Sequence, residues 1–244
     1  MRLTFLGTGA AGGTPGRGRS ARRESSLLVE SGVTVLIDAT TQLPDQLARA
    51  DRVDAILLTH AHRDAAGGLP GLARRRRDHG LGALPLYASK QAIGVLRARH
   101  RDLEFLRAKP VEPGRPRRFR GLTLSAVEVP HARDQRYRTF AWRLRHEGTT
   151  LVYASDVGRL EAPLERLARG AQLLVIDGAM WRRRLFAHLT IDRELPTLCQ
   201  WPVERILLTQ IGRTAPPHDA LERAVRDLCP KASPAWDGLT LQLT

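Results

Sequence analysis

The stretch Thr59-His60-Ala61-His62-Arg63-Asp64-Ala65-Ala66-Gly67-Gly68 decides the fold, and it follows an apolar run at residues 53–58. The run is typical of a buried strand, so the polar residues after it are expected at the edge of a sheet. Side chains two residues apart project to the same side of an extended chain. His60, His62 and Asp64 can therefore reach one metal ion from a single short segment. The alternative is that these histidines are ordinary polar loop residues.

Apolar periodicity predicts antiparallel strands at the start of the chain, at residues 2–6, 26–30 and 33–37, and alternating elements afterwards. Further strands are expected at 53–58, 84–87, 122–129, 139–145, 150–154, 172–176 and 204–208. Helices are expected at 41–49, 69–78, 89–99, 161–168, 190–200 and 218–228. The glycine- and proline-rich segment 110–121 is predicted to connect two halves of one domain that spans residues 1–244.

The glycines at residues 7–12 also match the fingerprint of a dinucleotide-binding site, which requires a helix directly after them. The residues that follow, Gly13-Thr-Pro15-Gly16-Arg-Gly18-Arg, disfavour a helix by about 1 kcal/mol for each Gly and about 3 kcal/mol for Pro. We therefore expect a flexible loop whose backbone approaches the metal cleft, with four arginines available to an anionic substrate. These are Arg17, Arg19, Arg22 and Arg23.

Several motifs in the same order resemble the metallo-β-lactamase superfamily, whose signature is His-x-His-x-Asp-His between a buried strand and a helix. Besides the histidine stretch they are Leu6-Gly-Thr-Gly-Ala-Ala-Gly-Gly13, Leu36-Ile-Asp38-Ala, Pro130-His131, Ala154-Ser-Asp156, Ala187-His188-Leu-Thr190 and Leu208-Thr-Gln210-Ile-Gly. In order and spacing they are similar to the branch that contains the tRNA 3′-end endonuclease RNase Z and the cyclic phosphodiesterase of phosphonate breakdown. The resemblance implies an α/β fold, a four-layer αββα sandwich.

The resemblance also implies a metal site. Its ligands would be His60, His62, His131 and Asp156. Three imidazoles and one carboxylate suit tetrahedral Zn²⁺. Taken singly, His131 after a proline and Asp156 before a turn are also common as loop or turn residues.

The second metal position of the superfamily is altered at two places in this chain. Ala65 stands where the superfamily has histidine, and Gln210 stands in place of its last histidine. Asp64, Asp156 and the amide oxygen of Gln210 would remain, and oxygen donors suit Mn²⁺ better than Zn²⁺. We expect one tight Zn²⁺ site and a weak second site for Mn²⁺ or a similar ion. His218 is either a replacement ligand or a surface histidine at a helix start.

The expected mechanism follows from this ligand set. Zinc lowers the pKa of a bound water to about 7 and so supplies hydroxide near neutrality. Asp64 could orient or deprotonate that water. His188 resembles the RNase Z-type histidine that stabilises and protonates the leaving group, and the alternative is a capping or buried histidine. If four protein ligands saturate the metal, no water binds and the site is structural.

Three functions remain open. The first is a metal-dependent hydrolase, a phosphodiesterase that uses metal-bound hydroxide on a nucleotide or a nucleic-acid-like substrate. The second is an acyl or lactone hydrolase, because the same chemistry serves both reactions and the fold does not choose between them. The third is a catalytically silent zinc-containing protein that binds an anionic ligand or RNA.

The formal net charge is +14, and Lys90, Lys109 and Lys231 are the only lysines among 39 basic residues. Guanidinium groups bind phosphate in bidentate geometry, so an anionic small molecule or a nucleic acid is the expected partner. The alternative is a solvated surface, because the arginine runs at 74–77, 115–120 and 182–184 lack interleaved aromatic residues.

No apolar stretch approaches the roughly 18 residues of a membrane span, so no membrane association and a cytoplasmic location are expected. Cys199 and Cys229 are the only cysteines, and they suit reduced thiols better than a disulfide framework. A homodimer is possible by analogy with the resembled proteins, although no apolar surface stripe indicates one.

Overall fold

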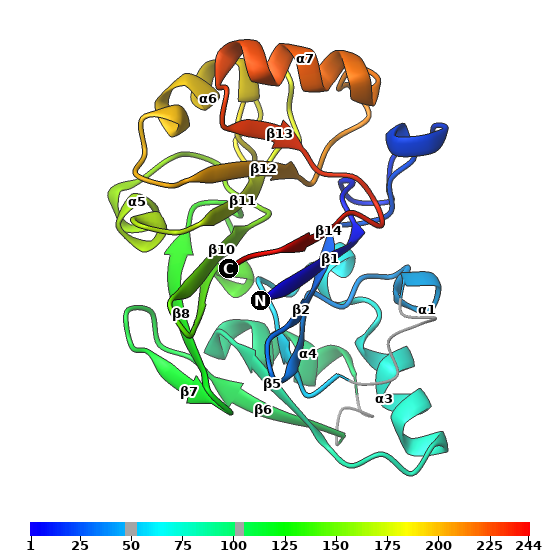
Figure 1. Cartoon of the computed structure of the whole chain (residues 1–244). Coiled ribbons are helices and arrows are strands. Elements are labelled where there is room, and N and C mark those ends of the chain that lie inside the picture. The colour runs from blue at the N-terminus through cyan, green and yellow to red at the C-terminus, as the bar shows by residue number, and fades with distance from the viewer. Residues whose placement is uncertain (47–52, 101–104) are drawn as a thin grey trace.

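Two seven-stranded sheets lie face to face in the computed structural model, which describes residues 1–46, 53–100 and 105–244 (Figure 1). The first sheet has the order β14-β1-β2-β3-β4-β5-β6, with bounds Thr240–Gln242, Arg2–Gly7, Ser26–Glu30, Thr34–Ile37, Ala55–Leu57, Leu84–Ala88 and Leu106–Pro110. The second has the order β13-β12-β11-β10-β9-β8-β7, with bounds Ala232–Pro234, Arg205–Thr209, Leu173–Asp177, Thr149–Ala154, Thr139–His146, Leu122–Val129 and Arg117–Phe119.

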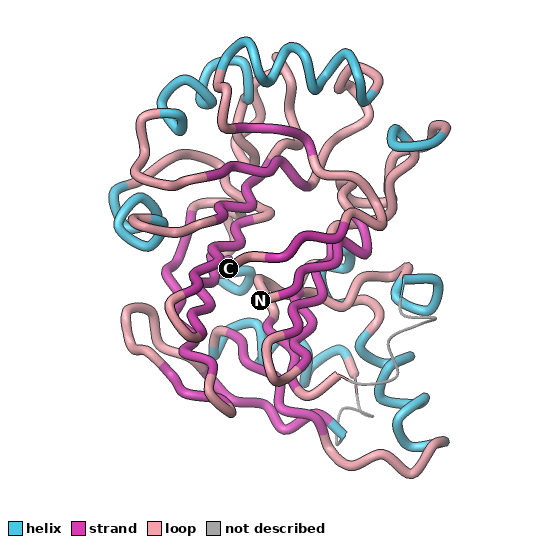
Figure 2. The backbone as a smooth tube through the Cα atoms, viewed as in Figure 1, coloured by secondary structure: helices cyan, strands magenta, loops and turns pink. Residues whose placement is uncertain are grey.

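Helices cover the outer face of each sheet, as the tube in Figure 2 shows. On the first sheet these are α1 (Leu43–Gln46), α2 (Arg63–Ala66), α3 (Leu69–Asp78) and α4 (Lys90–Arg99). On the second they are α5 (Ala162–Ala168), α6 (Ile191–Cys199) and α7 (His218–Leu228). Short 3₁₀ turns lie at η1 (Gly18–Ser20) and η3 (Gln135–Tyr137). The four-layer αββα sandwich is therefore confirmed.

Side chains alternate in direction along each strand and so contribute to two different apolar layers. In β11 every residue is buried, but Leu173 and Val175 pack into the core between the sheets, whereas Leu174 and Ile176 pack under the helices. Successive side chains of a strand point to opposite faces, so one apolar strand serves two cores. Each fully buried side chain of this kind stabilises the fold by about 1.5–3 kcal/mol. Trp142 and Tyr153 are the largest side chains in the central core.

The predicted elements agree closely where periodicity is strong. The predicted bounds of α3, α7 and β8 match the structure, and β1, β2 and β3 are antiparallel as expected. The segment 110–121 was predicted as a plain connection, but it contains β7, which pairs with β8. The predicted helix at 41–49 starts at Leu43, and its predicted end lies outside the described residues.

Within the described residues, no α-helix directly follows the glycine loop. The three-residue turn η1 comes next in the chain, and then β2. The dinucleotide alternative therefore has no structural support. Gly13 has a φ of +70°, and a Cβ there would lie 2.7 Å from the carbonyl oxygen of Arg22. Glycine is required at this position because the two arms of the loop pair closely, through Thr14 and Arg22.

The expectation of reduced thiols is wrong, because Cys199 and Cys229 form a disulfide with a Cα–Cα distance of 5.5 Å. Cys199 ends α6 and Cys229 follows the last residue of α7, and both helices pack on the same face of the second sheet. Sequence alone does not show that two helix ends thirty residues apart become neighbours. Among the described residues, no helix is both long and apolar enough to cross a bilayer.

Because the disulfide closes a loop with a sequence separation of 30, its loss should lower the free energy of unfolding by about 3.6 kcal/mol. Urea unfolding of wild type with and without reductant measures this change, and thiol counting in denaturant should find no free thiol before reduction. The Cys199→Ser/Cys229→Ser variant is the control, because its stability should not respond to reductant. Two free thiols in the untreated protein would contradict the pairing.

Candidate functional site

The candidate site lies where strands of both sheets end. His60 and His62 follow β4, His131 follows β8, and Asp156 follows β10. Ligand atoms of His60, His62 and His131 lie within 4.8 Å of one another, as do those of His60, Asp64 and Asp156. The structure thus brings together the residues that the motifs suggested.

His60 is fully buried and is hydrogen-bonded at one nitrogen only. The hydroxyl of Thr59 donates to Asp38, with an Oγ1–Oδ2 distance of 2.9 Å, so it can accept a bond from the Nδ1–H of His60, also at 2.9 Å. This chain of bonds places the imidazole proton on Nδ1. The Nε2 lone pair has no protein partner. A buried, unpaired nitrogen beside other imidazoles fits a metal ligand.

His131 is fixed in the same way, because its Nδ1 lies 2.8 Å from the carbonyl oxygen of Ala187, which only accepts. Its Nε2 is 3.3 Å from Nδ1 of His62. Two nitrogens bound to tetrahedral zinc at about 2.0–2.1 Å are separated by about 3.3 Å, so this spacing fits a shared ion.

His62 is held from outside the cluster by residues that the sequence did not indicate. The ring of Tyr137, in η3, stacks on His62 with centroids 4.3 Å apart. Arg99, at the end of α4, donates to the carbonyl oxygen of Ala61 at 3.0 Å and to the hydroxyl of Tyr137. The loop between the two histidines is thereby fixed to α4. No sequence motif signals this contact.

His188 lies beside the cluster and is held by a buried carboxylate. Its Nδ1 is 2.7 Å from Oδ2 of Asp177, the last residue of β11. Asp177 also accepts from the backbone N–H groups of Val157 and Ala179. One ligand atom each from His131, Asp156 and His188 lies within 4.8 Å of the others. The sequence missed Asp177, which reads as an ordinary strand end.

Burial and neighbouring charges set the protonation of these groups. Burial lowers the pKa of His60 and of His62 to about 4, so both are neutral and can donate a lone pair near pH 7. Burial would raise the pKa of Asp156, but the surrounding His60, His131 and His188 keep it below its usual value. For His188, burial lowers the pKa and Asp177 raises it, and the net value is about 9.

At the second metal position, the side chain of Gln210 bonds to two carboxylates. The side-chain amino group of Gln210 donates to Asp156 at 2.9 Å and to Asp64 at 3.2 Å. The amide oxygen was expected to face this position, but here the hydrogen bonds to the carboxylates come from the amino end, because carboxylates accept hydrogen bonds. Ala65, in α2, is buried in the apolar layer between the first sheet and its helices. Burial and the nearby Asp156 raise the pKa of Asp64.

His218 belongs to a different place. It starts α7, is buried instead of lying on the surface, and accepts a hydrogen bond from Arg22 at Nδ1, 2.9 Å away. Its neighbours with potential ligand atoms are Asp219 and Glu222. It is therefore not a replacement ligand in the cluster around His60.

Solved structures with a similar fold include three proteins with different names. A zinc-bound PqqB from Methylobacterium extorquens has a TM-score of 0.85 at 21% identity over all of both chains. A diphosphatase of the PhnP family has a TM-score of 0.87 at 23% identity, over all of this chain and 98% of the other. The short form of human tRNase Z has a TM-score of 0.72 at 19% identity over all of both chains. At these identities the likeness shows the fold alone.

Curated relatives match over part of their own length. An octanoyltransferase of Porphyromonas gingivalis is 26% identical over 98% of this chain, which spans about half, 51%, of that protein. A ribonuclease Z of Anoxybacillus flavithermus is 39% identical over 36% of this chain and 28% of its own length. The family model described as a beta-lactamase superfamily domain matches residues 33–211, most of the chain. The chain therefore belongs to the beta-lactamase superfamily and has the metallo-β-lactamase fold, as its motifs predicted.

Proposed function

We propose that the chain is a metal-dependent hydrolase that cleaves a phosphodiester of a nucleotide or nucleic acid. The observation that carries the proposal is the cluster of His60, His62 and His131 with Asp156, in which His60 Nε2 is buried without a partner. An imidazolium donor, His188, lies beside it. Hydrolysis by members of this superfamily is generally metal-dependent, and this donor set fits that chemistry.

His60, His62, His131 and Asp156 would hold one Zn²⁺, since three imidazoles and a carboxylate are typical zinc ligands. When bound, the ion supplies Lewis-acid polarisation of a phosphoryl oxygen and lowers the pKa of a water. The amino group of Gln210 already pairs with Asp64 and Asp156, so it opposes a second cation at that position. A weak Mn²⁺ site would require Gln210 to turn away.

The remaining polar groups have roles in proton transfer. Asp64 lies next to the cluster and is no longer needed by a second metal, so it can orient or deprotonate the attacking water. Asp177 bonds to Nδ1 of His188 and fixes the ring, leaving the other nitrogen to donate a proton to the leaving oxygen. This pairing of an imidazole with a buried carboxylate suits a positioned general acid.

A phosphate-containing substrate is supported by the basic charge of the chain and by the names of several relatives, among them ribonuclease Z and a diphosphatase. An acyl or lactone substrate is the second candidate, and the octanoyltransferase relative favours it, although the chain matches only about half of that protein. A catalytically silent zinc protein remains the third, because Ala65 and Gln210 alter the usual ligand set.

A cytoplasmic location and a homodimer also remain proposals. A disulfide is more common in oxidising compartments, so the pair Cys199–Cys229 weighs against the cytoplasm. The redox state of these cysteines in protein trapped directly from cells tests the location.

Metal analysis of the purified protein should find about one zinc per chain, lost in His62→Ala. In Gln210→His, alone or combined with Ala65→His, the zinc content should rise towards two, because imidazole replaces the amino group that pairs with Asp64 and Asp156. Gln200→His, at the exposed end of α6, is the matched control and should stay at one. Two zinc ions per chain in wild type would show that Gln210 does not exclude the second ion.

Thr59→Val should weaken zinc binding by about 10- to 100-fold, because His60 loses the hydrogen bond that fixes its proton on Nδ1. Competition with a chromogenic chelator measures the affinity. Thr150→Val, a buried threonine at the other end of β10 from Asp156, should bind zinc like wild type. Equal zinc affinity in Thr59→Val and wild type would show either that His60 is not a zinc ligand or that Thr59 does not orient it.

Hydrolysis of bis(p-nitrophenyl) phosphate should be abolished by chelator and restored by Zn²⁺. His188→Asn should reduce kcat by about 100- to 10,000-fold, as expected for loss of a general acid, with zinc content unchanged. His79→Asn, at the exposed end of α3, should keep wild-type kcat. Turnover of p-nitrophenyl octanoate but of no phosphodiester would favour the acyl hydrolase, and no turnover of either would favour the silent protein.

A further inference from the structure

A second concave region lies next to the candidate site and contains no carboxylate in its lining. It has a volume of about 400 Å³ and lies between the loop at residues 14–22 and the loop at residues 211–217. Thr14 joins the two loops, because its hydroxyl donates to the carbonyl oxygen of Ile211 at 2.9 Å. Ile211 directly follows Gln210, whose side chain bonds to Asp64 and Asp156 at the candidate site.

The floor of the cavity includes Arg22, which is only 5% exposed. Its guanidinium donates to Thr8 Oγ1 at 2.8 Å, to His218 Nδ1 at 2.9 Å and to the carbonyl oxygen of Ala235. All three acceptors are uncharged, because burial and the nearby Arg22 lower the pKa of His218 to about 4. A buried charge with only neutral partners is costly unless an ion of opposite charge comes close.

The carboxylate of Asp237 raises the pKa of Arg22 by its charge, but it forms its own hydrogen bonds with other groups. Asp237 accepts from the hydroxyl of Thr8 at 2.8 Å and from the backbone N–H of Arg23 at 2.6 Å. Burial lowers the pKa of Arg22 to about 10 even though Asp237 opposes this change. The positive charge is therefore only partly compensated by the protein.

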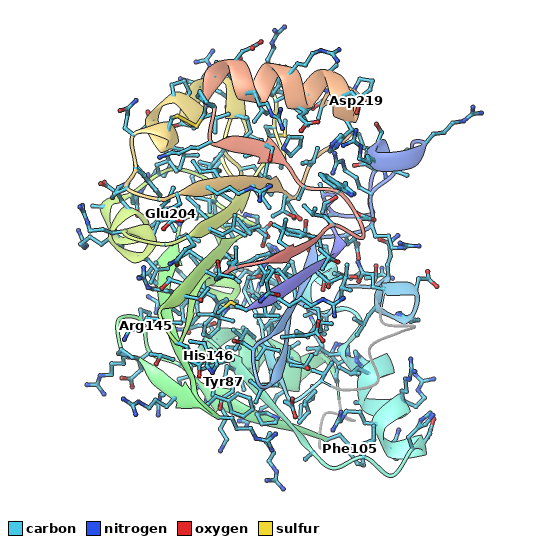
Figure 3. All side chains as sticks on the ribbon, in the orientation of Figure 1. Tyr87, Phe105, Arg145, His146, Glu204 and Asp219 are labelled. Atoms are coloured by element: carbon cyan, nitrogen blue, oxygen red, sulfur yellow. A yellow bond between two sulfur atoms is a disulfide. The ribbon has the colours of Figure 1, made fainter. Side chains whose placement is uncertain are left out.

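Two more arginines stand at the rim. Arg17 and Arg213 both line the cavity and are exposed, and neither has an acidic partner in the described part of the chain. Arg213 is oriented by a bond from its Nε to the carbonyl oxygen of Gly13 at 3.2 Å. The acidic groups nearby are already used, since Arg19 pairs with Asp219 and Glu222. In Figure 3 the label of Asp219 marks this end of α7, beside the N-terminal loop.

We propose that this cavity is a phosphate-binding subsite, in which Arg22 forms a fixed cationic floor and Arg17 and Arg213 close on the anion. Guanidinium groups bind tetrahedral oxyanions in bidentate geometry, and the polar residues Thr14 and Ser20 line the same space. The volume falls in the range of small-molecule sites, about 300–1,000 Å³, so a phosphate with its attached sugar fits. In the substrate this would be a second phosphate, distinct from the one that is cleaved, and that assignment rests on the proposed function.

Calorimetric titration of the zinc-loaded protein with inorganic phosphate tests the subsite. Charge-assisted hydrogen bonds predict a loss of affinity of about tenfold for each of Arg17→Gln and Arg213→Gln. Arg223→Gln, an exposed arginine of α7 that lines no part of the cavity, is the matched control and should bind like wild type. Equal binding by wild type and the Arg17→Gln/Arg213→Gln variant overturns the proposal, and so does an equal loss in the control, which would indicate an unspecific basic surface.

Two chromogenic substrates separate free phosphate from a substrate phosphate. They are the p-nitrophenyl ester of thymidine 5′-phosphate and the same compound with a 3′-phosphate. In wild type, kcat/KM should be about tenfold higher for the phosphorylated compound, and the ratio should fall towards one in the double variant. An unchanged ratio in a variant that has lost phosphate binding would overturn the assignment to the substrate. If no phosphodiester is cleaved at all, the proposed function fails, while the calorimetric titration still decides the subsite.

Discussion

The candidate site depends on one buried imidazole that is bonded at one nitrogen and unpaired at the other. Asp38, Thr59 and His60 form a chain of hydrogen bonds inside the first sheet, and this chain leaves Nε2 of His60 with its lone pair free. An unpaired buried acceptor lowers stability in the absence of a partner, so the fold retains it at a cost of about 1–3 kcal/mol. A metal ion shared with His62 and His131 is the partner that fits the spacing.

Protein groups compensate charge at two places beside the candidate site. At the second metal position, the amino group of Gln210 bonds two carboxylates that would otherwise repel each other. Asp177 likewise faces His188 and keeps an imidazolium next to the cluster. Both contacts place fixed polar neighbours around the cluster of His60, His62 and His131. Fixed donors and acceptors of this kind need no reorganisation during a reaction.

In the arginine-rich loop near the amino terminus, the four arginines differ in burial and in their partners, which composition alone does not indicate. All four of its arginines were expected to be available to an anion, but Arg22 is buried and Arg19 is paired with acidic residues of α7. This division leaves a cationic cavity with a fixed floor and two exposed arginines. Net charge alone does not distinguish such a cavity from a solvated basic surface, because only position determines which cations lack a counter-ion.

The sequence by itself determined the long elements and the order of the candidate ligands, because apolar periodicity and the residues after each strand are local properties. The sandwich was implied by the resemblance that its motifs carry. Short edge strands such as β7, with its sequence Arg-Arg-Phe, carry too little periodicity to be recognised. The Asp177–His188 pair, the stacking of Tyr137 on His62, the orientation of Gln210 and the Cys199–Cys229 disulfide were decided only by the tertiary structure. Each joins residues from different elements, and their proximity arises from the packing of strands and helices that no local pattern encodes.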